Sequence, residues 1–256
     1  DIVAWLGKII GGTMGFFIGG PLGLIAGIAF GNLFDSSNTQ SDSSRISSFS
    51  SIDQTQMVFF VGAFSMLAKM VTSDGSMVSS ERQKIEEFIT RDLKLGQEGR
   101  NAALKVFNAA LGNSGSFEQF AIQFYQNFAH ERSLLELMMD VLVRVAAADG
   151  DISAPEMSLI NSAAKIFRIN ESLLASIIKR YSSISASPSK AYSVLNLTPE
   201  ASIDEIKKSY RKLSIEFHPD TVASKGLPEE FTRFATEKFR AIQEAYETIK
   251  KERGIK

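Results

Sequence analysis

The stretch ASIDEIKKSYRKLSIEFHPD, residues 201–220, decides how the C-terminal part of this 256-residue chain folds. Its apolar residues recur at intervals of three and four, which is the spacing of one helix face, so we expect a helix over residues 203–217. Pro219 cannot continue that helix, and we therefore expect it to end at the sequence His218-Pro219-Asp220. The apolar face would consist of Ile206, Tyr210, Leu213 and Phe217.

A second amphipathic helix is expected over residues 229–251, after a polar loop that runs to Pro228. Two helices of this kind bury their apolar faces by packing against each other, so we expect an antiparallel hairpin with the HPD sequence at its tip. A short helix over residues 191–195 precedes it. The apolar face of the last helix comprises Phe231, Phe234, Phe239, Ile242 and Tyr246, and the cations left facing outward are Lys207, Lys208, Arg211 and Lys212.

The residues alone leave two interpretations of the HPD sequence. In the first, Pro219 simply ends the helix while Asp220 caps the turn. Alternatively, the exposed tip has a function of its own. A metal site is not indicated, because His218 has neither a second histidine nearby nor a cysteine anywhere in the chain. No serine nearby has an evident base, so a hydrolase triad is not indicated either.

The C-terminal segment resembles a J-domain, the module with which DnaJ-type co-chaperones activate DnaK-type ATP-driven chaperones. The resemblance implies that the basic helix docks on an acidic partner surface, that Tyr210 belongs to the binding face, and that the HPD residues trigger ATP hydrolysis by the partner. Thr221 departs from the many J-domains that have lysine there. The matching residues are Ala191-Tyr192-x-Val194-Leu195, Ile206-Lys207-Lys208-x-Tyr210-Arg211-Lys212-Leu213, His218-Pro219-Asp220 and Phe239-x-x-Ile242-x-x-Ala245-Tyr246.

The middle of the chain, residues 53–181, is expected to be an α-helical bundle, because its apolar residues recur at helical spacing and no segment alternates as a strand would. Serine-rich stretches at residues 35–52 and 182–189 are typical of linkers. The expected helices cover residues 59–71, 80–89, 100–111, 117–129, 132–149 and 155–167.

This bundle contains an internal repeat in which a helix, an Asp-Gly turn and a second helix occur twice, from Met70 and from Val145. One interpretation is structural, since aspartate and glycine end helices and turn the chain. The other is a site for a divalent cation, because carboxylates suit calcium or magnesium, although the spacing departs from the twelve-residue calcium loop. The repeat resembles the TerB-like domain, some members of which are thought to bind metal. The candidate ligands are Asp74, Glu81, Asp149, Asp151 and Glu156.

Near the N-terminus, GGTMGFFIGGPLGLIAGIAFG at residues 11–31 has a glycine at every fourth position. No charged residue occurs between Lys8 and Asp35, and those 26 residues would reach about 39 Å as a helix, enough to cross a bilayer. Small residues at this spacing let two membrane helices approach closely. We therefore expect a membrane-spanning glycine-zipper helix within residues 1–34 that also pairs the chain into a homodimer. The zipper residues are Gly11, Gly15, Gly19, Gly23, Gly27 and Gly31.

Composition and motifs restrict the remaining possibilities. A net charge of −1 gives no footprint for general nucleic-acid binding, so no nucleic-acid partner is expected. No cysteine is present, which excludes disulfides and thiolate sites. Neither a GxxxxGK[ST] loop nor a GxGxxG turn is present, so we expect no ATP site in this chain and no cofactor. The resemblance to a J-domain then implies a regulator of a partner ATPase, not an enzyme. His130, the only histidine of the bundle, fits a surface residue better than a catalytic base.

As a whole, the sequence predicts an all-α protein: a transmembrane helix (1–34), a linker (35–52), a TerB-like bundle (53–181), a second linker (182–189) and a J-domain hairpin (190–256). This architecture resembles the membrane-anchored DnaJ-like co-chaperones of the DjlA family. The resemblance implies a bacterial inner-membrane protein whose C-terminal region is cytoplasmic, since the DnaK-type partner needs ATP. The alternative is a metal-responsive TerB-like interaction or signalling protein that uses its J-domain only for docking.

Overall fold

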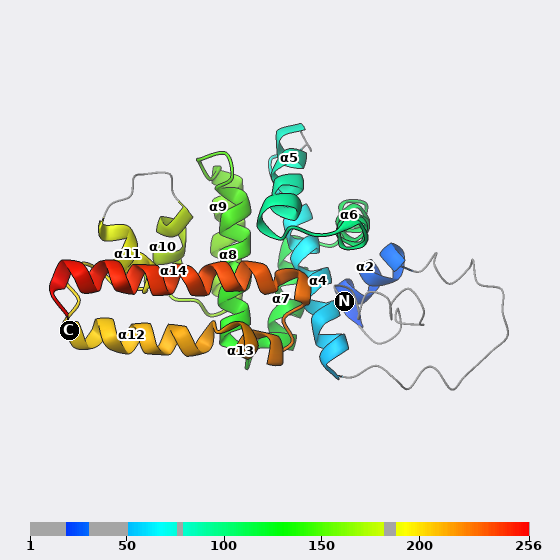
Figure 1. Cartoon of the computed structure of the whole chain (residues 1–256). Coiled ribbons are helices and arrows are strands. Elements are labelled where there is room, and N and C mark those ends of the chain that lie inside the picture. Colours follow the sequence, from blue (N-terminus) through cyan, green and yellow to red (C-terminus); the bar gives the residue numbers. More distant parts are fainter. Residues whose placement is uncertain (1–18, 31–50, 76–78, 182–187, 256) are drawn as a thin grey trace.

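The computed structural model describes residues 19–30, 51–75, 79–181 and 188–255, and all regular elements within these ranges are helical (Figure 1). The all-α prediction is therefore confirmed. The proposed zipper residues Gly11, Gly15 and Gly31 lie outside the described residues, as does most of the predicted membrane helix. Among the helices that the structure describes, none combines the length and the apolar character needed to cross a membrane.

The middle of the chain forms a helical bundle, called the bundle below, around α4 (Ser51–Met70). Helix α4 is apolar on nearly every side, and Met57–Ala68 is buried throughout, so it needs neighbours all round it. Gly62 permits the closest approach, because a Cβ there would lie 2.7 Å from Cδ2 of Phe124. The other bundle elements are α5 (Ser79–Glu87), the π-helical turn η3 (Phe88–Asp92), α6 (Gln97–Leu111), α7 (Phe117–Phe128), α8 (Arg132–Ala146), α9 (Ala154–Ile166) and α10 (Glu171–Tyr181).

Two features of the bundle differ from the sequence prediction. Helix α10 was not predicted, although Leu173, Leu174 and Ile177 give it a buried face at helical spacing. The second helix of the first repeat copy continues into η3, where Leu93 N–H donates to the Phe88 carbonyl at 2.9 Å in place of the usual α-helical pairing.

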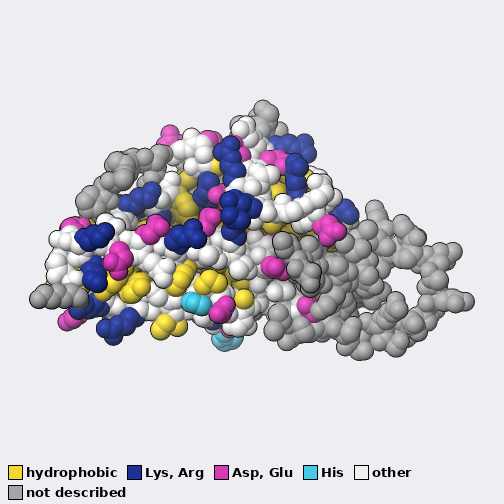
Figure 2. Space-filling model, viewed as in Figure 1, with side chains coloured by type: hydrophobic (Ala, Val, Ile, Leu, Met, Phe, Trp, Pro, Cys, Tyr) yellow, Lys and Arg dark blue, Asp and Glu magenta, His cyan; other side chains and the backbone are white. Residues whose placement is uncertain are grey.

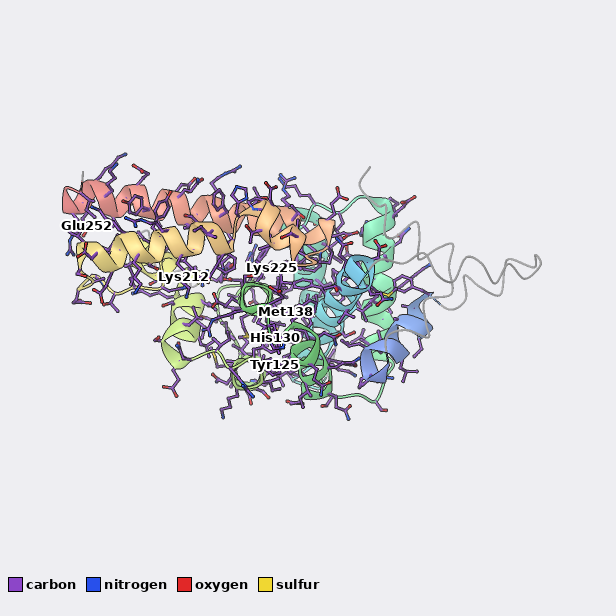
Figure 3. The ribbon with its side chains drawn as sticks, turned by 90° about the horizontal axis from the view of Figure 1, so that it is seen from below. Tyr125, His130, Met138, Lys212, Lys225 and Glu252 are labelled. Atoms are coloured by element: carbon purple, nitrogen blue, oxygen red, sulfur yellow. The ribbon has the colours of Figure 1, made fainter. Side chains whose placement is uncertain are left out.

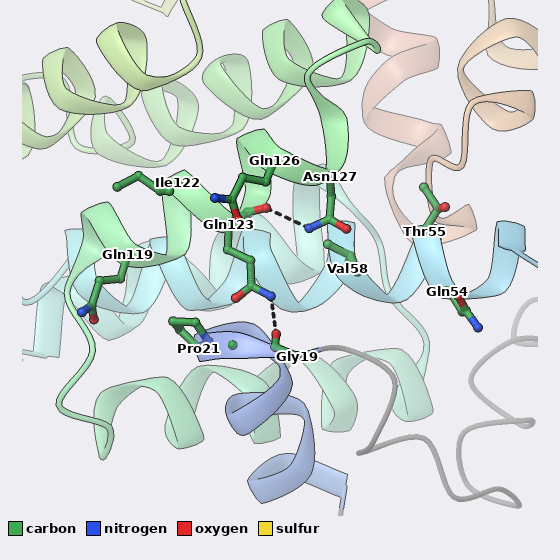
Figure 4. Close-up of a pocket in the computed structure, with 11 residues that line it drawn as sticks. Gly19, Pro21, Gln54, Thr55, Val58, Gln119, Ile122, Gln123, Gln126 and Asn127 are labelled. Atoms are coloured by element: carbon green, nitrogen blue, oxygen red, sulfur yellow. Dashed lines mark hydrogen bonds between the residues drawn. The ribbon is translucent and has the colours of Figure 1, made fainter.

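Helix α2 (Gly20–Phe30) lies within the glycine-rich stretch and packs against α4, α6 and α7. Its buried face comprises Leu22, Ile25, Ala26 and Phe30, whereas Leu24 and Ile28 are about half exposed. The helix begins at Gly20, which has a φ of 72°, and the side-chain amide of Gln123 holds this start (Figure 4). Gln123 Nε2 donates to the Gly19 carbonyl at 2.5 Å, and Leu22 N–H donates to Gln123 Oε1 at 2.8 Å.

The C-terminal helices form the predicted hairpin, called the hairpin below: α12 and α14 run antiparallel with the HPD sequence at their junction (Figure 1). Helix α12 begins with a capping box in which Ser202 and Glu205 satisfy each other's backbone N–H groups. The sequence predicts a polar loop after the HPD residues, and this prediction is wrong in part, because the helix α13 forms there. The elements are α11 (Pro188–Val194), α12 (Ile203–Glu216), α13 (Pro219–Ser224) and α14 (Glu229–Arg253).

The first turns of α14 pack into the bundle and not onto α12 alone, as the sequence had predicted for Phe231 and Phe234. The Phe231 ring lies 5.0 Å from Phe59 and 6.1 Å from Phe64, both in α4. Phe234 contacts Phe88 with a centroid separation of 6.0 Å. These apolar residues share one face of α14, but that face is longer than α12, so its beginning is covered by the bundle.

The loop before α14 is also fitted to α4. Gly226 has a φ of 93°, and a Cβ there would lie 2.4 Å from Cγ2 of Thr55, so only glycine fits. The side chain of Gln56 donates to the Leu227 carbonyl at 3.3 Å. The bundle and the hairpin therefore meet through backbone and side chains together.

We expect Phe231→Ala to destabilise the protein by about 3–5 kcal/mol, because it empties a site between four aromatic rings. Urea unfolding followed by circular dichroism would also show a smaller m-value if the hairpin and the bundle no longer unfold together. The control is Ile249→Ala, a buried residue at the opposite end of α14. A loss below about 1 kcal/mol for Phe231→Ala, with an unchanged m-value, would contradict the role given to this contact.

Candidate functional site

The HPD residues form the start of α13. His218 is the N-cap of this helix, and its Nδ1 atom accepts a hydrogen bond from the Asp220 backbone N–H at 3.3 Å. Pro219 occupies the first turn, where its missing N–H costs nothing. Helix α12 ends before Pro219, as the sequence predicts, but the cap assigned to Asp220 is corrected: Pro219 opens the next helix, and His218 caps it. The side chains of His218 and Asp220 are 47% and 94% exposed.

The exposed histidine is supported from below by the hairpin core. Its ring meets the Phe239 ring edge-on, with centroids 5.3 Å apart and planes at 75°. Phe217, the residue before it, is fully buried, and the Lys238 ammonium lies 3.8 Å from the centre of its ring. Phe217 and His218, which follow α12 directly, are thus each in contact with a residue of α14.

The predicted basic face of α12 is present beside this tip. Lys208, Arg211 and Lys212 are exposed, and Lys207 is half-buried. Ile215 lies at the same helical spacing after Lys208 and Arg211 and is 69% exposed, which makes it an apolar contact point that sequence reasoning missed. The sequence feature that could have identified Ile215 is a large aliphatic side chain at a position outside the apolar face expected to be buried. Figure 2 shows further hydrophobic atoms along the seam between α12 and α14, with basic side chains nearby.

Tyr210, the remaining predicted binding residue, is half-buried and stacks on Tyr246 with ring centroids 4.0 Å apart and planes at 8°. The structure thus gives it a role in joining α12 to α14. At the end of α12, burial raises the pKa of Glu216, while the Lys212 ammonium acts in the opposite direction. The Lys212–Glu216 ion pair is long, at 3.8 Å, and leaves Lys212 accessible.

The side of the tip opposite the solvent faces helix α8 of the bundle (Figure 3). Lys225, the C-cap of α13, donates to Ser133 Oγ at 2.9 Å and pairs with Glu131 at 3.5 Å. His130 lies in the neighbouring turn and is exposed. It has the surface position that the sequence predicted.

The candidate metal residues are brought together only in part. Lys84 lies between Asp149 and Glu156, with its Nζ atom 3.2 Å from a carboxylate oxygen of each. Burial by itself lowers the pKa of Lys84, but the hydrogen bonds and charges of the two carboxylates outweigh it and raise the pKa above its usual value. The second oxygen of Glu156 accepts hydrogen bonds from the Ser153 N–H and hydroxyl in a capping box. The ammonium thus stands where a cation was expected.

Two of the other candidate ligands lie at the surface. Asp74 and Asp151 are exposed, and the Glu81 side chain lies outside the described residues. In the part of the chain that the structure describes, no three His, Cys, Asp or Glu side chains are grouped so that they could hold a metal ion. Because Glu81 is not described, the five-residue cation site stays a prediction.

A pocket of about 680 Å³ lies where α2 begins, between α4 and α7 (Figure 4). Carboxamides dominate its lining, among them Gln54, Gln119 and Gln126. Among the described residues that line it, none has an acidic, basic or histidine side chain.

Comparison with known protein families divides the chain in the same way. Residues 3–45 match the model described as the co-chaperone DjlA transmembrane domain. Residues 61–178 match the tellurite resistance protein TerB, and residues 190–255 match the DnaJ domain. The hairpin is therefore a DnaJ domain, and the bundle is a TerB domain.

Relatives named co-chaperone protein DjlA match the chain over nearly its whole length. The chain is 28% identical to the co-chaperone protein DjlA of Coxiella burnetii, over 98% of this chain and 99% of that protein. It is 28% identical to DjlA of Photobacterium profundum with the same coverage, and 25% identical to DjlA of Escherichia coli K12 over 98% of both chains. No solved structure matches the chain.

We expect Lys84→Met to destabilise the bundle by about 3–5 kcal/mol, since the buried Glu156 carboxylate would lose its cation. Thermal unfolding at pH 7 measures this loss of stability. The raised pKa of Lys84 means that the ion pairing is fully present below pH 10.5 and is lost only as the pH rises through the higher value, so it is intact at pH 7. Lys105→Met, an exposed substitution, is the matched control. Equal stability of the two variants would show that Glu156 does not need the ammonium.

Proposed function

Because this chain belongs to the DjlA family of membrane-anchored, J-domain co-chaperones, we propose that its HPD tip stimulates ATP hydrolysis by a DnaK-type chaperone. The chain itself is a regulator and not an enzyme. The observation that carries the proposal is the exposed His218-Pro219-Asp220 corner, held at the end of a helix whose outer face is basic. A trigger that acts on another protein has to be both accessible and fixed in direction, and this corner combines the two.

The docking face that we assign comprises the cations of α12 and the apolar contact next to them. Lys208, Arg211 and Lys212 would steer the hairpin toward an acidic partner surface. Steering alone gives little affinity once both surfaces are desolvated. Ile215, exposed beside the HPD corner, supplies apolar area next to these cations.

The N-terminal DjlA transmembrane domain anchors the chain to a membrane. We propose that the membrane is the bacterial inner membrane and that the bundle and hairpin lie on its cytoplasmic side, where the ATP-dependent partner works. We also propose that the glycine repeat pairs two copies. Gly27 supports this, since a Cβ at that position would meet no atom of the described residues within 4 Å, which leaves room for a neighbouring helix. Gly23 in contrast is buried.

The test is single-turnover ATP hydrolysis by a bacterial DnaK, with the full chain in nanodiscs. We expect the wild-type chain to accelerate hydrolysis and His218→Gln to give no acceleration at any salt concentration, because glutamine keeps the size but not the ring contact with Phe239. Equal acceleration by both chains would reject the HPD mechanism. No acceleration by either, with both folded by circular dichroism, would reject the proposed function.

The same assay at several salt concentrations tests the docking face. Lys208→Ala with Arg211→Ala should raise the half-maximal concentration most at low salt, because screening removes the steering above roughly 0.1–0.2 M. Ile215→Ser should raise the half-maximal concentration by the same factor at all salt concentrations. Lys105→Ala, exposed on the bundle, is the control for a change of charge alone. A salt-independent loss in the double variant would argue against steering.

The pairing proposal is tested with Gly27→Leu in a membrane self-association reporter. Leucine is apolar, so insertion should be unaffected, whereas its bulk at Gly27 should keep two helices apart and lower association. Ile28→Leu, at an exposed neighbouring position, is the control. Undiminished association of Gly27→Leu would remove this part of α2 from the dimer interface.

A further inference from the structure

A buried ion cluster joins the bundle to the hairpin close to the HPD tip. Its centre is Asp140 in α8, which is fully buried. The Oδ1 atom of Asp140 pairs with the Arg180 guanidinium at 3.1 Å and accepts from the Tyr181 hydroxyl at 3.3 Å, both from the bundle. Its Oδ2 atom accepts from Lys238, which comes from α14 of the hairpin. The two oxygens therefore serve two different domains.

Lys238 is not needed to neutralise Asp140, because Arg180 already does so within the bundle. Burying the Lys238 ammonium at this position is unfavourable. Its side chain is 7% exposed, and burial lowers its pKa, although the Asp140 charge acts in the opposite direction. A methionine would bury the same stem without a charge. The charge at position 238 therefore calls for a role beyond filling space.

The second contact of the ammonium suggests that role. Lys238 Nζ lies 3.8 Å from the centre of the Phe217 ring, so the ammonium is held between a carboxylate of the bundle and an aromatic ring of the hairpin. Exclusion of water strengthens an attraction of this kind. Phe217 is the last residue before the HPD corner. The next residue of α14, Phe239, supports the His218 ring.

We propose that Asp140 is a positioning residue for the HPD motif: it fixes the Lys238 ammonium, which holds the Phe217 ring and thereby the direction in which His218 and Asp220 leave α12. The TerB domain is then part of the active form of the J-domain and not only a spacer between it and the membrane. This inference rests on the proposed function, since it concerns how well the tip acts on its partner.

The proposal separates efficacy from docking. The basic face of α12 and Ile215 do not contact the cluster in the described structure, so loss of Asp140 should leave the half-maximal concentration of the co-chaperone nearly unchanged. The maximal acceleration should fall, because a misdirected trigger binds but acts poorly. A merely structural role would instead lower the amount of folded protein and leave the activity per folded molecule unchanged.

The experiment measures both parameters in single-turnover ATP hydrolysis by DnaK, with the full chain in nanodiscs. We expect Asp140→Asn and Lys238→Met each to lower the maximal acceleration on the order of tenfold. Lys238→Arg, which retains a cation between the carboxylate and the ring, should recover most of it. Tyr181→Phe removes a hydrogen bond to Asp140 without touching Lys238 and should behave as wild type.

A double-mutant cycle tests whether Asp140 acts through Lys238. Adding Asp140→Asn to Lys238→Met should cause no further loss, whereas independent effects would multiply and overturn the proposal. If Asp140→Asn does not fold, Lys238→Met decides alone, because it leaves Asp140 paired with Arg180. Wild-type maximal acceleration by folded Lys238→Met would overturn the inference and leave the proposed function intact.

A second measurement needs no partner. The chain has no cysteine, so Ala223→Cys, exposed one turn after the HPD residues, takes a single spin label. We expect the label to become more mobile in Asp140→Asn and Lys238→Met but not in Tyr181→Phe. If wild type fails to stimulate DnaK, the proposed function is rejected, and this spectrum still decides whether Asp140 positions the tip. Unchanged mobility in both variants would overturn the inference.

Discussion

The packing of the start of α14 into the aromatic core of the bundle is the contact on which the arrangement of this protein depends. Phe231 lies among Phe59, Phe60, Phe64 and Phe88, so a residue of the hairpin completes the core of another domain. A hairpin joined to the bundle only by the chain at residues 182–187 would be free to reorient. Aromatic rings buried at this density leave little freedom of that kind.

This constraint places the HPD corner with respect to the bundle. The corner projects from α12, but both of its sides are tied to α8: through Lys238 and Asp140 before it, and through Lys225, Ser133 and Glu131 after it. The face that carries Lys208, Arg211 and Ile215 remains exposed. The same contacts that hold the corner thus leave the docking face of α12 open.

The glycine-rich segment shows how one stretch of sequence can satisfy two surroundings. Its second half, α2, covers the bundle with Leu22, Ile25 and Phe30, while Leu24 and Ile28 on the other side stay exposed. A segment that is apolar all round suits a membrane, a protein groove or both. In the bundle, the side-chain amide of Gln123 supplies the hydrogen bonds that backbone groups would otherwise make. It donates to the carbonyl of Gly19 and accepts from the N–H of Leu22 at the point where the helix starts.

The sequence by itself determined the helical class, the J-domain hairpin, the basic face of α12 and the place of the HPD corner, because helical periodicity and proline act over a few residues. It also indicated the TerB domain through the repeated Asp-Gly turn. Only the tertiary structure decided the rest. Lys84 neutralises Asp149 and Glu156 from 65 and 72 positions away, as Lys238 reaches Asp140 from 98. Periodicity places a side chain on a helix face but does not say which distant helix covers that face, and that choice rests on how ions and aromatic rings find partners once the whole chain is packed.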